Sequence, residues 1–168
     1  MGSLDRLLSS DPRETLQFFF TGLRDVTSGE AVDERAVLYN ASVLAHFAST
    51  STATSTGLPT PASLADVFDR FVIDTSFRED PELLELAGGQ ILLLTGFFAD
   101  HLKARFNLKW YGELGAGFYA TCAVLSHSPA HREMMSHMAG RFDYWRSSHL
   151  KLSRELRDLP YLGLFRAS

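Results

Sequence analysis

Six histidines and a single cysteine are the residues of this 168-residue sequence best suited to chemistry. His127 and His131 lie four positions apart, a spacing that can place two imidazoles on one helix face as metal ligands. Glu133 and His137 could add further ligands to such a pair. A Ser-Pro pair between the two histidines predicts a helix start, however, and so separates them. We therefore expect surface or interface histidines and no metal site.

The sequence offers little support for other kinds of catalytic or cofactor-binding site. No Glu-x-x-His pair occurs, which weighs against a carboxylate-bridged di-iron bundle, and no phosphate-binding G-x-x-x-x-G-K-[ST] loop occurs. A haem ligand at His46 or His101 stays open as an alternative. Cys122 has the neighbours of a buried helix, where a thiol acts as a small hydrophobic group, so we expect core packing and no nucleophile. We predict no cofactor.

A polar group follows the central apolar stretch. Asp100 and His101, with Arg105 and Glu113, could form an acid–base site around a basic turn. No nucleophile or substrate anchor accompanies them. The sequence therefore favours a protein that is not an enzyme and has no catalytic residue to assign.

The elements that would position these residues are helices. Pro12, Pro61, Pro81 and Pro129 each follow an Asp, Thr or Ser, the pattern of a capped helix start. No alternating strand pattern occurs. Apolar periodicity predicts helices over residues 11–26, 33–48, 80–102, 110–125 and 128–159, with shorter ones at 3–9 and 63–73. The predicted fold is all-α, a single compact bundle of six to seven helices forming one domain over residues 1–168.

The stretch from residue 83 to residue 125 is the predicted centre of the bundle. Its first helix is apolar nearly all round and contains Gly88, Gly89 and Gly96, which would allow close approach or a bend. Its second helix carries a stripe of small residues at Gly112, Ala116, Ala120 and Ala123. We expect these two helices to pack together. Residues 49–60, rich in Ser and Thr, are expected to be a flexible loop.

The long C-terminal helix carries a sustained heptad pattern over residues 131–159. Aromatic residues and Met are enriched in protein interfaces, so this pattern is either core or a face for a partner. We interpret it as the partner-binding face of a homo-oligomer, in the simplest form a homodimer. The residues assigned to this face are Met135, Met138, Phe142, Trp145, His149 and Leu152.

The overall composition argues against several classes of protein. The formal net charge of −4 speaks against a general nucleic-acid binder. One cysteine allows no intrachain disulfide, and the acidic N-terminal residues do not form a signal peptide, so we expect a cytoplasmic protein. No apolar run approaches the roughly 20 residues needed to span a bilayer.

Over about 40 residues of the central stretch, the sequence resembles a family of uncharacterised bacterial all-helical proteins. In these proteins an apolar helix ends in a Gly-Phe-Phe-like turn, and basic residues and a Tyr-containing helix of small residues follow. The matching residues are Leu94, Gly96, Phe97, Phe98, Lys103, Arg105, Tyr111, Gly115, Ala116 and Tyr119. The resemblance implies an all-helical fold and brings no activity with it.

These observations favour a non-enzymatic protein–protein interaction or scaffold protein that acts through its C-terminal helix. The alternative is a small-molecule binding domain, for haem or an apolar ligand, with a Phe-lined pocket gated by residues 49–60. Thirteen Phe residues support such a pocket.

Overall fold

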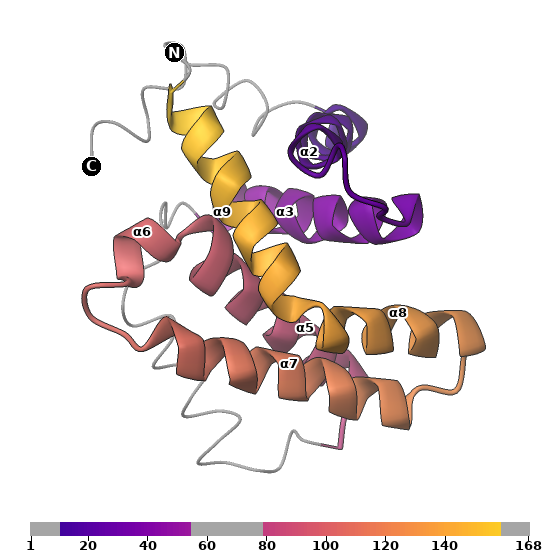
Figure 1. The fold of residues 1–168 in the computed structure, drawn as a ribbon. Coiled ribbons are helices and arrows are strands. Elements are labelled where there is room, and N and C mark those ends of the chain that lie inside the picture. Colours follow the sequence, from indigo (N-terminus) through magenta and orange to yellow (C-terminus); the bar gives the residue numbers. More distant parts are fainter. Residues whose placement is uncertain (1–10, 55–78, 159–168) are drawn as a thin grey trace. The chain divides into compact units, whose positions relative to one another are not determined.

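The computed structural model describes residues 11–54 and 79–158, and within them every regular element is helical. This confirms the all-α prediction. The described part of the chain contains seven α-helices and one π-helical turn, and Figure 1 shows how the α-helices follow one another along the chain. Their bounds are α2 Pro12–Val26, α3 Glu34–Thr54, α5 Pro81–Leu92, η3 Leu93–Phe97, α6 Ala99–Leu102, α7 Leu108–Leu125, α8 Pro129–Gly140 and α9 Phe142–Asp158. The helices expected at residues 3–9 and 63–73 lie outside the described residues.

Three helices begin at the capping pairs that the sequence predicts. The side chain of Asp11 accepts the backbone N–H of the second helical residue of α2, at 2.9 Å. Asp80 accepts two backbone N–H groups of α5, and Ser128 accepts the N–H of His131 in α8. Each cap is followed by a proline that has no N–H to satisfy.

The described chain forms two compact units. One combines α2 and α3 with α9 from Ser148 onward, and the other contains α5 to α8 with the start of α9 up to Ser147. The single domain expected over residues 1–168 stays a prediction.

In the first unit, α2 packs against α3 and buries Leu23 and Leu44 (Figure 1). Leu152 of α9 closes over Gly22 of α2, where an added Cβ would lie 2.8 Å from Leu152 Cδ1. Helix α3 continues to Thr54, so the first half of the loop predicted over residues 49–60 is helical, and that boundary is wrong. Residues 55–60 lie outside the described part of the chain.

In the second unit, α7 lies side by side with α5 and with α8 (Figure 1). The ring of Tyr119 covers Gly88, where a Cβ would meet ring carbons at 3.1 Å. A Cβ on Gly115 would lie 2.7 Å from Phe142 Cζ and 2.9 Å from Ile91 Cγ2. Close approach at these glycines confirms the predicted pairing of the central helix with the small-residue helix. Gly115 was not part of the predicted stripe of small residues, and Ala120, which was part of it, is exposed.

The central helix, expected to be continuous over residues 80–102, is interrupted by the π-helical turn η3. The N–H of Phe98 bonds the carbonyl of Leu93 at 3.0 Å, five residues back. Thr95 Oγ1 donates to the carbonyl of Ile91 at 2.7 Å and so competes for an α-helical acceptor. With Gly96 next to it, this competition accounts for the wider turn.

The long C-terminal helix predicted over residues 128–159 is two helices, α8 and α9, separated at Arg141. Gly140 is a weak helix former, and it stands at the end of α8. The heptad pattern therefore spans two helices, and the prediction of one long C-terminal helix is wrong.

Candidate functional site

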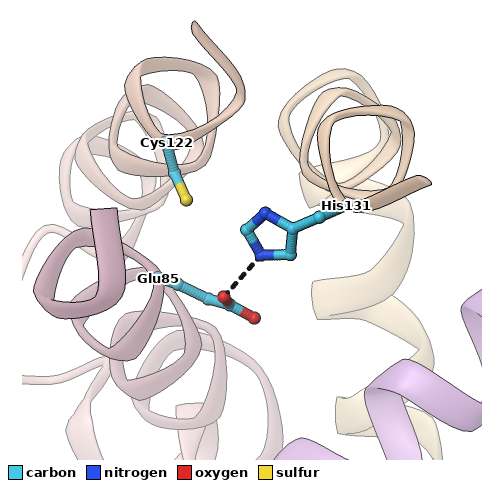
Figure 2. A group of neighbouring side chains, drawn as sticks. All are labelled: Glu85, Cys122 and His131. Atoms are coloured by element: carbon cyan, nitrogen blue, oxygen red, sulfur yellow. Dashed lines mark hydrogen bonds and ion pairs between the residues drawn. The ribbon is translucent and has the colours of Figure 1, made fainter. Parts of the chain in front are cut away.

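Three side chains from three helices meet in the second unit. They are Glu85 of α5, Cys122 of α7 and His131 of α8, and Figure 2 shows them pointing toward one another. One potential ligand atom from each lies within 4.8 Å of the other two. The closest pair is His131 Nε2 and Glu85 Oε1, which are 2.8 Å apart. This cluster is the densest group of metal-ligating side chains in the described residues.

The orientation of His131 is held from both sides. Its Nδ1 lies 2.8 Å from Ser126 Oγ, and its Nε2 faces Glu85. Ser126 is buried at the end of α7, its hydroxyl lies 3.4 Å from the carbonyl of Ser128, and its own carbonyl accepts Arg132 Nη2 at 2.8 Å. Because both ring nitrogens have fixed partners, the imidazole is positioned before any ligand arrives.

Cys122 is fully buried, and its Sγ donates to the carbonyl of Pro81 at 3.3 Å. Burial, and then the nearby carboxylate of Glu85, raises the pKa of the Cys122 thiol to about 11. The prediction of a buried core thiol is confirmed.

The cluster is poorly arranged for nucleophilic catalysis. A cysteine nucleophile needs a base that takes its proton and an environment that lowers its pKa. Here the ring nitrogens of His131 pair with Ser126 and Glu85, and the thiol stays protonated at neutral pH. What the three groups do offer is sulfur, nitrogen and oxygen donors around one point.

The other residues weighed as metal ligands in the sequence lie apart from this cluster. His127 and Glu133 are exposed, and His137 Nε2 accepts a hydrogen bond from Trp145 Nε1 at 3.0 Å. Glu85 was missed, although one signal pointed to it, since it is a carboxylate between Leu84 and Leu86 in a mostly apolar helix.

The residues assigned to a partner-binding face are buried within the single chain. Met135, Met138, Trp145 and His149 have no measurable exposure, and Phe142 and Leu152 are each 3% exposed. His149 Nε2 lies 2.9 Å from Asn40 Oδ1 in the core of the first unit. Side chains already covered by their own chain are not free to meet a partner, so these six residues are core packing and their assignment to a partner-binding face is wrong.

The predicted polar group lies on the surface. His101, Arg105 and Glu113 are exposed, and Asp100 pairs with Lys103 at 3.2 Å. Neither of the two grooves described below is lined by any of them. His46 and His101, the haem-ligand candidates, are both exposed.

Each unit carries a shallow groove. In the first unit a groove of about 700 Å³ runs between α2 and α9, with Phe18, Leu152 and Leu156 among its lining residues. Phe18 is the one aromatic residue among the described residues that line it, and the Phe-lined pocket stays a prediction. In the second unit a groove of about 540 Å³ lies between α7 and α8. Its lining residues are Ala120, Ala123, Val124, Arg132, Ser136 and Ala139.

The outer face of α7 exposes two large apolar side chains, together with Glu113 and Thr121. Trp110 is 41% exposed and Val124 is 79% exposed. Gly117 lies midway between them, and no described heavy atom lies within 4 Å of the place where its Cβ would be. Gly112 and Gly115 of the same helix differ, because a Cβ there would meet side chains of this chain. Internal packing therefore explains those two glycines and does not explain Gly117.

The chain matches no model of a known protein family, no curated protein and no solved structure. The resemblance to bacterial helical proteins stays a prediction. Among the described helices, none combines the length and the apolar character needed to cross a bilayer.

Proposed function

We propose that this chain is a non-enzymatic interaction protein that self-associates through the outer face of α7. The proposal keeps the homo-oligomer expected from the sequence and moves its contact surface from the buried heptad residues to α7. The observation that carries it is Gly117, a glycine inside a helix with no described heavy atom within 4 Å of the place where its Cβ would be. A glycine there costs about 1 kcal/mol against alanine, and the described part of the chain gains no close contact from it.

The positions of the exposed residues fit two copies of α7 packed antiparallel. Trp110 lies seven residues before Gly117, and Val124 lies seven residues after it. Seven-residue steps drift by only about 20° around a helix, so the three residues share one face. A twofold axis at Gly117 would bring Trp110 of each copy opposite Val124 of the other, about 10 Å from the axis.

Small residues favour this contact. Gly117 allows two helix backbones to approach closely, as small residues do in tightly packed helix pairs. The groove between α7 and α8 adjoins Val124 and is lined mainly by alanines. It offers a place for the indole of Trp110 from the second copy, and buried Trp is a frequent anchor of interfaces. The outer face of α7 is thus complementary to the same face of a second copy.

Sedimentation equilibrium of the full chain, from low to high micromolar concentration, tests the proposal. The wild type is expected to dimerise, and Gly117→Leu and Val124→Asp are each expected to raise the dimer dissociation constant at least roughly thirtyfold, the loss typical of an interface hot spot. Gly140→Leu and Leu86→Asp are the matched controls. Gly140 also has open space around it, and Leu86 is 54% exposed on another helix.

A wild-type chain that stays monomeric at high micromolar concentration would overturn the proposal. An equally tight dimer in both α7 variants would overturn it as well. Gly117→Ala gives an independent check on the premise, because it is expected to stabilise the folded monomer by up to about 1 kcal/mol against urea.

A further inference from the structure

We propose that Glu85, Cys122 and His131 bind a single transition-metal ion of the zinc class, with a fourth coordination position open to water. The site lies among α5, α7 and α8, each of which supplies one ligand (Figure 2). It is independent of the dimer proposed above, because Cys122 is on a buried side of α7.

The donor set is one that Zn²⁺ prefers. Thiolate sulfur, imidazole nitrogen and carboxylate oxygen bind zinc at about 2.0–2.3 Å, and three protein ligands with one open position form a common tetrahedral arrangement. Ligand atoms of such a site lie roughly 3.3–3.8 Å from one another, as those bond lengths require. Here the three atoms lie within 4.8 Å of one another, with the His131–Glu85 pair at 2.8 Å. Side-chain adjustments of about 1 Å or less, in line with those bond lengths, would complete the geometry.

The hydrogen bonds of His131 favour a cation at this point. Ser126 Oγ is positioned to donate to the carbonyl of Ser128, which leaves it to accept Nδ1–H of His131. In that tautomer the lone pair of His131 Nε2 faces an oxygen of Glu85 at 2.8 Å. Two acceptors so close need a proton or a metal ion between them. Fixing the second ring nitrogen of a ligating histidine in this way is typical of metal sites.

Charge and access also fit a divalent ion. When the ion binds, the S–H bond of Cys122 breaks, the sulfur–metal bond forms, and the proton leaves to solvent. The resulting thiolate and the carboxylate of Glu85 together balance the two positive charges of Zn²⁺, so a half-buried site carries no net charge. The side chains of His131 and Glu85 are 37% and 30% exposed, which gives the ion a route from solvent.

Titration of the metal-free full chain with Co²⁺, followed by competition with Zn²⁺, tests the inference. Wild type is expected to bind one equivalent of Co²⁺ with tetrahedral ligand-field bands and a thiolate-to-cobalt charge-transfer band. Cys122→Ser is expected to abolish the charge-transfer band, and Glu85→Gln is expected to weaken Zn²⁺ affinity by at least about tenfold. His127→Gln is the matched control, because His127 is exposed in the segment between α7 and α8 and lies outside the cluster.

The metal titration can also contradict the inference. Absence of stoichiometric Co²⁺ or Zn²⁺ binding by the folded wild type would overturn the inference. So would binding without a thiolate band, or binding that survives Glu85→Gln unchanged and is lost in His127→Gln. Circular dichroism establishes that each variant is folded, and Glu85→Gln keeps the question answerable if the buried Cys122→Ser does not fold.

Discussion

Lowering the pH below about 6.5 is expected to destabilise the first unit through His149. This histidine is fully buried, and burial lowers its pKa from 6.5 to about 3. Asn40 Nδ2 donates to the carbonyl of Ala36 at 2.8 Å, which turns Asn40 Oδ1 toward His149 Nε2 at 2.9 Å. His149 therefore donates from Nε2. Its Nδ1 is buried and has no hydrogen-bond partner among the described residues, so a proton there would have no acceptor.

The sign and size of the effect follow from linkage. The unfolded chain takes up a proton at His149 as the pH falls through 6.5, whereas the native chain does so only near pH 3. The contribution of His149 to the free energy of unfolding is therefore complete above pH 6.5. Below that pH it falls by about 1.4 kcal/mol per pH unit. Between about pH 7.5 and pH 5 the loss from this one group is about 2 kcal/mol, a large share of a typical domain's stability.

Urea unfolding at fixed ionic strength, repeated across this pH range, measures the loss. The wild type contains other groups that titrate, so the informative quantity is its difference from His149→Gln, which cannot gain a proton. Gln can still donate an N–H toward Asn40 Oδ1. His46→Gln removes an exposed histidine of the same unit and controls for the loss of an imidazole as such.

Two results would refute the reasoning about His149. One is a pH dependence of unfolding that is the same in wild type and His149→Gln. The other is an NMR titration in which the ring protons of His149 shift near pH 6.5 in the folded protein. Either result would mean that the native state accepts the proton easily and that the Nδ1 side of the ring has an acceptor.

Two further predictions concern packing and capping. Gly115→Val is expected to destabilise the second unit by about 1–3 kcal/mol in urea, since a Cβ there would already lie under 3 Å from Phe142 and Ile91, and unchanged stability would show that this contact can relax. Asp80→Ala is expected to cost about 1 kcal/mol, because two N–H groups of α5 lose their acceptor, while Asp80→Asn should retain most of that stability; equal losses in both variants would argue against the cap.

Local features of the fold were readable from the sequence. Asp11, Asp80 and Ser128 cap their helices because capping depends on a few neighbouring residues. The close pairing of α5 with α7 was also predictable from Gly88 and the small residues of α7, although Gly115, which makes the closest contact with α5, was not among those assigned.

The candidate site was only partly readable. The sequence suggested His131 as a metal ligand only together with His127, and we expected no metal site. The neighbours of His131 in the structure, Glu85 and Cys122, are set by how three helices pack, which spacing along the chain does not encode. The heptad residues illustrate the same limit. Met135 and Trp145 have the composition of an interface, but core and interface share that composition, and only burial within the chain separates them.

The way α9 completes the first unit has a consequence for the order of events during synthesis. Helices α2 and α3 leave the ribosome early, but Leu152, which covers Gly22, and His149, which bonds Asn40, are made more than a hundred residues later. The second unit lies between them in the chain and can complete its contacts first. The apolar faces of α2 and α3 therefore stay without their contacts to α9 until that helix has been synthesised. During this interval the nascent chain is most exposed to aggregation and to chaperone binding.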